Sequence, residues 1–261
     1  MSRKRLIPKL QLARSARNPN KLVVVITKQF GERIEIGDPI SQAKIFQDQS
    51  ADELIFLNID GSSSNIRILS EMIDKVSEEI FMPLTVGGGV TTEEDFRTLL
   101  SHGADKISIN SKAVEDPSFI TKVSARYGAQ CVVASIDYKK EGDGKFYVYI
   151  SCGKIKTNLD PVAWAIEAER LGAGELMITC IDHDGSRNGI ELEVPNKIVA
   201  AVSIPVICGG GCGLAMHFSQ AFTEANVDAV CAGSFFAHRD QNLIQTRSQI
   251  VNAGVNIRVQ N

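Results

Sequence analysis

The sequence lacks three features that would direct the protein to a membrane, an export pathway or nucleic acid. It has no run of about 18 apolar residues, so no segment is suited to a membrane-spanning helix. The basic start MSRKRLIPKL has too short an apolar segment for a signal peptide, and no small-residue cleavage site follows it. A formal net charge of −3 gives no basic field for nucleic acid. These absences predict partners other than membranes and nucleic acids.

The six cysteines also lack a metal-site spacing, because no two of them form a C-x-x-C pair. Cys131, Cys180, Cys208 and Cys231 lie in apolar, strand-like runs, where a free cysteine packs as a small hydrophobic residue. We therefore expect core cysteines, no metal ion and no other cofactor. A reducing cytoplasm is the expected compartment.

Short apolar runs alternate with segments of helical period along the whole chain. The eight strand candidates are RLIPKLQL, ELIFLNI, PLTVGG, KISIN, CVVASID, ELMITCI, PVICGG and AVCAG. Continuous apolar strands separated by amphipathic helices are typical of a parallel sheet covered by helices. Eight such units in 261 residues predict a single α/β domain over 1–261, a (β/α)8 TIM barrel.

Local signals mark the helix ends and two long connections. Asp-Pro pairs at Asp38, Asp116 and Asp160 each predict an N-cap followed by proline at the first helical position. Residues 13–37 and 141–158 are long for such connections and contain apolar or alternating runs. We expect a hairpin in each, at the rim formed by the C-terminal ends of the strands.

The sequence repeats itself at a nearly constant offset. Glu53 and Glu175 open similar strands 122 residues apart, and the glycine triplets beginning at Gly87 and Gly209 have the same separation. GADKISINS and NVDAVCAGS then match in the same register. Three matches in one register predict two similar half-barrels.

Each half contains a glycine-rich turn after a strand, followed one strand later by small or polar residues. Backbone N–H groups in such turns can approach an anion closely. Two cups on one rim predict a substrate with phosphate at both ends, or an elongated one; the alternative is that the glycines only allow close helix packing. Asp60, Asp182 and Asp184 also fall at the rim, and Asp184 with Gly185 could hold phosphate.

Two strand ends provide the candidate acid–base chemistry. Asp137 ends the fifth predicted strand, where barrel enzymes place catalytic groups, and a carboxylate there can act as acid or base. The alternative is a carboxylate that caps the following turn. The first strand presents Gln11, an amide where a second carboxylate would suit this chemistry.

The segments LTVGGGV, ADKISINSKAVEDP, CVVASID, GAGELMITCIDHDGS and IPVICGGGCG resemble the cyclase subunit of imidazole glycerol phosphate synthase over nearly the whole chain. The resemblance implies a barrel with half-barrel symmetry and a heterodimer with a glutaminase bound at its N-terminal face. Ammonia would pass through the barrel to a phosphorylated small-molecule substrate. An ammonia gate is implied at four charged residues that would otherwise be read as solvated strand starts: Arg5, Glu53, Lys106 and Glu175.

The resemblance also implies the substrate contacts. Asp137 matches one of the two catalytic aspartates. Phosphate and substrate positions match in both halves at Gly89, Asn110, Ser111, Thr179, Asp184, Gly185, Gly210, Gly211, Gly233 and Ser234.

The departures from the family pattern cluster at the positions that match catalytic and substrate-binding residues. Gln11 stands where the family has its other catalytic aspartate, Lys9 stands for a cysteine, and Asn58 for an aspartate. Ile26 aligns with a substrate-binding lysine, and Gly209 with a serine. A glutamine cannot relay a proton, and losing such a group costs about 10²–10⁴ in rate.

The gate residues are retained although a catalytic aspartate is lost. This combination favours an enzyme with a different reaction over a cyclase that has lost its activity. We expect an ammonia-using paralogue that converts an acetamido group of a nucleotide-linked surface sugar to an acetamidino group. The alternatives are a histidine-pathway cyclase working with Asp137 alone, a non-catalytic barrel that activates a glutaminase, and the related phosphoribosyl isomerase. The gate and Gln11 both count against the isomerase.

Overall fold

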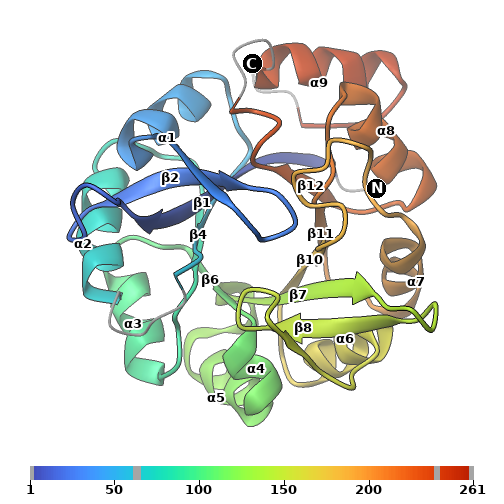
Figure 1. Cartoon of the computed structure of the whole chain (residues 1–261), viewed down its shortest axis with the longest axis horizontal. Helices are drawn as coiled ribbons and strands as arrows, with labels where there is room; N and C mark the ends of the chain where they lie inside the picture. The colour runs from blue at the N-terminus through green and yellow to red at the C-terminus, as the bar shows by residue number, and fades with distance from the viewer. Residues whose placement is uncertain (1–2, 61–65, 238–241, 259–261) are drawn as a thin grey trace.

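Eight parallel strands close into a barrel in the computed structural model, which describes residues 3–60, 66–237 and 242–258. The barrel strands, in spatial order, are β1 (Arg5–Arg14), β4 (Leu54–Asn58), β5 (Leu84–Gly87), β6 (Lys106–Ile109), β7 (Val132–Lys140), β10 (Glu175–Cys180), β11 (Val206–Gly209) and β12 (Ala229–Ala232). The sheet closes because β1 pairs in parallel with both β12 and β4. The predicted TIM barrel is confirmed (Figure 1).

Helices surround the strands and alternate with them along the chain (Figure 1). They are α1 (Pro39–Asp48), α2 (Ile66–Ser77), α3 (Glu93–Ser101), α4 (Ser111–Glu115), α5 (Ser118–Tyr127), α6 (Pro161–Arg170), α7 (Glu193–Ala201), α8 (Ala215–Glu224) and α9 (Leu243–Asn252). Their apolar faces and the outward side chains of the strands form the main core. The described helices are too short or too polar to cross a membrane.

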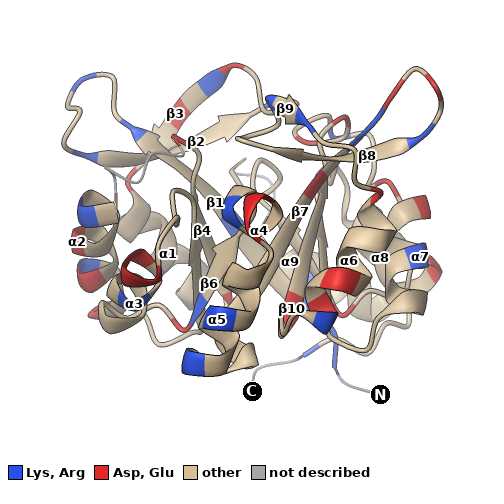
Figure 2. Ribbon diagram, turned by 90° about the horizontal axis from the view of Figure 1, so that it is seen from below, with Lys and Arg blue, Asp and Glu red and all other residues tan. Residues whose placement is uncertain are grey.

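Two hairpins extend the barrel at the C-terminal ends of the strands, as the sequence predicted. β2 (Leu22–Thr27) runs antiparallel to β1 and continues into β3 (Arg33–Gly37). β8 (Phe146–Ile150) runs antiparallel to β7 and pairs with β9 (Ile155–Lys156). Figure 2 shows both hairpins together at one end of the barrel. The two extensions begin at the strands that carry Gln11 and Asp137.

Two of the three predicted N-caps are confirmed. The Asp38 side chain accepts from Ser41 N, and that of Asp160 accepts from Val162 N and Ala163 N. The prediction for Asp116 is wrong, because α5 begins at Ser118 and its cap position is Pro117. A short helix, α4, ends just before Asp116, whose carboxylate accepts from the Ser118 hydroxyl at 2.6 Å.

Side chains that point into the barrel form layers along its axis, because successive residues of a strand face opposite sides. An apolar layer crosses the middle: Ile7, Ile55, Val133, Met177, Ile207, Ala229 and Cys231. Cys180, Cys208 and Cys231 are buried as predicted, but Cys131 is only half-buried. It lies in the 3-10 turn Ala129–Cys131 that precedes β7, outside the strand expected to hold it.

Candidate active site

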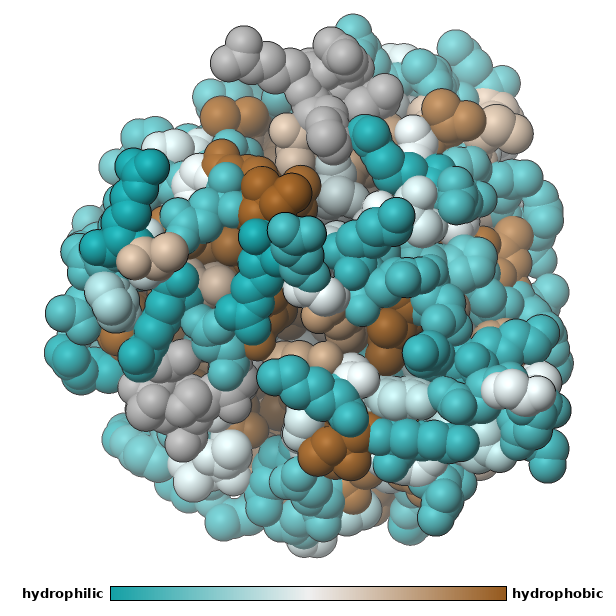
Figure 3. Space-filling model, in the orientation of Figure 1, coloured by the Kyte–Doolittle hydropathy of each residue, from teal (hydrophilic) through white to brown (hydrophobic). Residues whose placement is uncertain are grey.

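A cavity of about 460 Å³ opens at the C-terminal ends of the barrel strands. Lys9, Gln11, Asn110, Asp137 and Thr179 are among its lining residues, so the structure brings these sequence candidates together. The surface of the face that carries the hairpins is largely hydrophilic (Figure 3). This is the end at which barrel enzymes place their chemistry.

Asp137 provides a titratable carboxyl group in this cavity. Its Oδ2 accepts a hydrogen bond from Asn110 Nδ2 at 2.7 Å. Burial raises the pKa of Asp137 to about 7, even though Lys9 and the Asn110 hydrogen bond act to lower it and Asp184 adds to the increase. A carboxyl with that pKa can both accept and return a proton near neutral pH.

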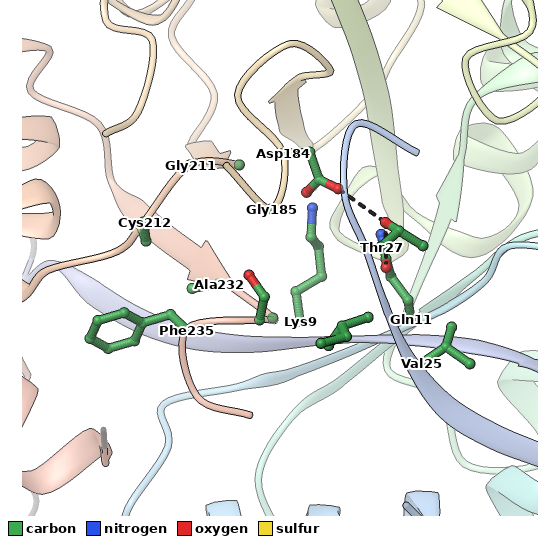
Figure 4. A pocket seen from close by; sticks show the side chains of 14 residues that line it. Lys9, Gln11, Val25, Thr27, Asp184, Gly185, Gly211, Cys212, Ala232 and Phe235 are labelled. Carbon is green, nitrogen blue, oxygen red and sulfur yellow. Dashed lines mark hydrogen bonds between the residues drawn. The ribbon is translucent and has the colours of Figure 1, made fainter. Parts of the chain in front are cut away.

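Gln11 faces Asp137 from the opposite side of the barrel, since β1 and β7 are four strands apart in either direction. The Thr27 hydroxyl on β2 lies 3.0 Å from Gln11 Oε1 and 3.2 Å from Asp184 Oδ2 (Figure 4). One hydroxyl carries one hydrogen, so Thr27 donates to one of these two oxygens at a time, unless the Gln11 amide is turned so that its Nε2 donates to Thr27 while Thr27 donates to Asp184. Burial raises the pKa of Asp184, against the lowering effects of Lys9 and Thr27.

The first predicted phosphate position, called here the first cup, consists of Gly89, Asn110 and Ser111, and all three residues line the main cavity. Gly89 has a φ of 82°, which favours glycine. The Ser111 hydroxyl accepts from Ser151 N, so the second hairpin is fastened to this side. Asn110 Oδ1 and Asn58 Nδ2 are buried with no hydrogen-bond partner among the described residues. They are buried polar atoms of cavity-lining residues whose hydrogen bonds the described residues leave unsatisfied.

The second predicted position, called here the second cup, consists of Asp184, Gly185, Gly210, Gly211, Gly233 and Ser234, which share one small pocket. Gly210 and Gly211 have φ values of 88° and 105°. A Cβ on Gly211 would lie 2.1 Å from the Gly189 carbonyl oxygen, so only glycine fits this turn. The free volume is about 20 Å³, enough for one or two water molecules or for the leading oxygen of a larger group.

A closed ring of charges occupies the N-terminal end of the barrel. Arg5 contacts Glu53 at 2.5 Å and Glu175 at 2.6 Å, while Lys106 Nζ contacts the same two carboxylates at 3.1 Å and 2.8 Å. Burial would raise the pKa of Glu53, but the charges of Arg5 and Lys106 lower it below its usual value. The structure therefore places all four predicted gate residues in mutual contact.

The ring, the apolar layer and the cavity follow one another along the barrel axis. The ring is formed by residues at the start of β1, β6 and β10 and just before β4, and the apolar layer begins two residues further along each of β1 and β10. Beyond the ring the inward side chains are mostly apolar, although the buried Thr85 lies opposite Ile55 of this layer, so an ion passing there would have to give up most of its hydration.

Sequence reasoning missed the contributions of Lys9 and Thr27. Lys9 is noted as a departure from the family, but only alternation along β1 with Gln11 could show that it points inward. Thr27 comes from a hairpin whose packing onto the rim no local pattern encodes. Within the described residues no group of three or more His, Cys, Asp or Glu is placed to hold a metal ion.

Comparison with known proteins gives concordant matches along the chain. Residues 18–242 match the family described as "Histidine biosynthesis protein". The chain is 47% identical over 262 residues to the "Putative imidazole glycerol phosphate synthase subunit hisF2" of Prochlorococcus marinus (strain MIT 9313), with all of both chains covered. It is 40% identical over 258 residues to the "Imidazole glycerol phosphate synthase subunit HisF" of Alkaliphilus metalliredigens, covering 99% of this chain and 100% of the relative. The HisF subunit of Lactococcus lactis is also 40% identical, over 260 residues, with 99% of this chain and 98% of the relative covered.

Proposed function

The chain belongs to the histidine biosynthesis protein family as a HisF-like synthase subunit, and from this premise we propose that it uses ammonia from a glutaminase partner to amidinate a sugar. The partner binds at the N-terminal face, where the charge ring lies, as the other half of a heterodimer. The acceptor is the acetamido group of a nucleotide-linked sugar, whose linking phosphate occupies one of the two cups, the second, at the opposite rim.

The observation that carries this proposal is the contrast between the two ends of the barrel. At the N-terminal end, Arg5, Glu53, Lys106 and Glu175 form a complete ring. At the other end, Gln11 provides an amide held by Thr27 where a second acid–base carboxylate would be needed. An entry route for ammonia without the paired carboxylates of a cyclase supports ammonia chemistry on another acceptor.

The cavity suits an amide acceptor. Ammonia nitrogen forms a bond to the carbonyl carbon, and the carbonyl oxygen leaves as water after receiving the two protons that the nitrogen gives up. Asp137, with a pKa of about 7, can carry one of these protons at a time. The unpartnered donor of Asn58 and acceptor of Asn110 supply contacts for the amide or the sugar.

A second candidate is the histidine-pathway cyclase itself. Two full-length relatives at 40% identity have that name, and Asp137 retains the carboxyl group that would serve it. Under this alternative the bisphosphorylated substrate would occupy the same two cups, and Gln11 would be a tolerated change.

One assay separates the candidates. The purified protein receives isotopically labelled ammonium and either the histidine-pathway bisphosphate or nucleotide-linked acetamido sugars, each with and without a nucleoside triphosphate that could activate the amide oxygen. Label in an amidino sugar supports the proposal, and cyclisation of the bisphosphate replaces it with the second candidate.

The same assay exposes the third possibility, a barrel that only activates a glutaminase. In that case an added glutaminase partner would hydrolyse glutamine faster with the barrel present, while no acceptor takes up label. Gln11→Asp is measured alongside, because gain of cyclisation in that variant alone would show that residue 11 separates the two reactions.

A further inference from the structure

Lys9 occupies an unusual position for a charged side chain. It is 4% exposed and lies on β1 between Ile7 of the apolar layer and Gln11 at the rim. It lines both the main cavity and the second cup. Figure 4 shows its side chain rising from β1, with Nζ directed toward Asp184. The ammonium group thus lies at the floor of the site, where the two spaces meet.

The ammonium group has unused hydrogen-bonding capacity. It carries three N–H donors, yet its one hydrogen-bond acceptor among the described residues is Thr179 Oγ1, at the long distance of 3.4 Å. No carboxylate of the described residues lies within 4.0 Å of Nζ to form an ion pair. Burying an ammonium with so few partners is costly, so the site is incomplete without a further acceptor.

The second cup supplies the place for that acceptor. Among the described residues, Lys9 is the only cationic residue that lines it, and Asp184 the only anionic one. Ile26 gives one wall an apolar surface, and four glycines form part of the remainder. A phosphate bound to the backbone of this cup would need a cation to offset Asp184, and Lys9 is the one that the described lining provides.

Gly209 lies beside the lysine. A Cβ at this position would lie 3.6 Å from Lys9 Nζ, an ordinary contact distance, but only 2.5 Å from Cys231 Sγ. A larger residue would therefore collide with the cysteine. Gly209 is required by the close approach of Cys231, and it places the second glycine turn next to the ammonium group.

We propose that Lys9 is a substrate-anchoring residue whose ammonium group binds the phosphate oxygen that enters the second cup. The cup admits one leading oxygen, and the glycine turn contacts the remainder of the group from the rim. The inference deepens the proposed function and rests on it in taking the second cup as a phosphate site. It holds for either acceptor, because both carry phosphate.

The test is an amide NMR titration of the full chain with inorganic phosphate. In the unmodified protein, the backbone signals of Gly210, Gly211 and Gly233 should shift and saturate. In Lys9→Met they should require roughly 10- to 100-fold more phosphate, as expected for loss of a charge-assisted hydrogen bond. First-cup signals, at Gly89 and Ser111, should titrate alike in both proteins.

Two further variants control the result. Lys44 lies on α1 and forms an exposed ion pair with Glu79. Lys44→Met removes the same charge far from the cups and should leave the titration unchanged. Lys9→Gln keeps a donor for Thr179 without the charge; it should weaken phosphate binding as Lys9→Met does, and it serves if the methionine variant does not fold.

The titration can overturn the proposed role of Lys9 independently of whether the protein uses ammonia. Equal phosphate affinity of the second-cup signals in the unmodified and Lys9 variants would show that Lys9 is not the anchor, while the cup itself stands. Absence of any second-cup response in the unmodified protein would remove the phosphate site as well. Amidination or its failure is measured separately with labelled ammonium, so the two proposals fail by different observations.

Discussion

The two halves of the barrel share one backbone plan but carry different side chains. On the first half, Gln11 lies opposite Leu57 in the β1–β4 register; on the second, Asp137 lies opposite Thr179 in the β7–β10 register. The next strands agree, since Leu57 lies opposite Gly87 and Thr179 opposite Gly209. In both halves the first strand also continues into an antiparallel hairpin at the rim.

The side chains at these matched positions differ in kind. The first half presents the cation and the amide of Lys9 and Gln11, whereas the second presents the hydroxyl and carboxyl of Ser135 and Asp137. The charge ring takes Arg5, Glu53 and Lys106 from the first half and only Glu175 from the second, although the matched carboxylates Glu53 and Glu175 each contact both cations. The two halves thus match in backbone and in these two carboxylates, while their other polar side chains differ.

The largest expected effect concerns the acid–base asymmetry. Asp137→Asn should lower ammonia-dependent turnover about 10²- to 10⁴-fold, because the amide cannot accept a proton. Gln11→Leu, at the matched position, removes no titratable group and should cost far less. Both variants are assayed with saturating ammonium and the acceptor that the labelled-ammonium assay identifies. Thermal unfolding of each variant is measured to check that it is folded. Equal losses in the two variants would mean that the halves share the chemistry.

The two matched carboxylates of the charge ring should respond alike. Glu53→Gln and Glu175→Gln each leave Arg5 and Lys106 with one carboxylate instead of two, and removing one partner of a buried ion pair costs about 3–5 kcal/mol. We expect similar losses in the free energy of unfolding, measured by urea denaturation. Glu79→Gln, which disrupts the exposed pair with Lys44, is the control and should cost less than about 1 kcal/mol. A large difference between Glu53 and Glu175 would show that the two carboxylates are not equivalent in the ring.

Stability should fall with rising pH because of Asp137. Its pKa is about 7 in the folded chain and near the ordinary 3.8 when unfolded, so the folded state holds the extra proton between these values. Between pH 5 and pH 8 this removes roughly 2–3 kcal/mol of unfolding free energy, at about 1.36 kcal/mol per pKa unit. Asp184, whose pKa burial also raises, acts in the same direction.

The variant Asp137→Asn isolates the contribution of one carboxyl. Urea denaturation at pH 5 and pH 8 should show a smaller pH-dependent loss in the variant than in the unmodified protein, by roughly the same 2–3 kcal/mol. Identical losses in the two proteins would place the folded pKa of Asp137 near its ordinary value, and its role as a base near neutral pH would then lose its support.

The barrel could be predicted from the sequence because its strands are buried on both faces and therefore read as unbroken apolar runs. The glycine-rich turns could be located because each directly follows a strand, whereas the charge ring was predicted only through the family resemblance, because a charge before an apolar run otherwise indicates a solvated strand start. The role of Lys9 could not be predicted, because it depends on which face of β1 points inward and on the second cup that other strand ends form around it. The Thr27 contact required the tertiary position of the first hairpin, and the Asp116 cap failed because α4 ends immediately before it.

The smallest expected effect tests whether the repeat extends to the outer helices. Asp38 and Asp160 are separated by the same 122 residues and cap α1 and α6, but Asp38 accepts from one backbone N–H and Asp160 from two. Replacing either with alanine should cost about 1 kcal/mol, with the larger loss at Asp160. Asp116→Ala should have a smaller effect, because the cap position of α5 is Pro117, which makes no side-chain cap hydrogen bond. Thermal unfolding of the three variants gives the order, and a loss at Asp38 exceeding that at Asp160 would show that the second N–H contact adds no stability.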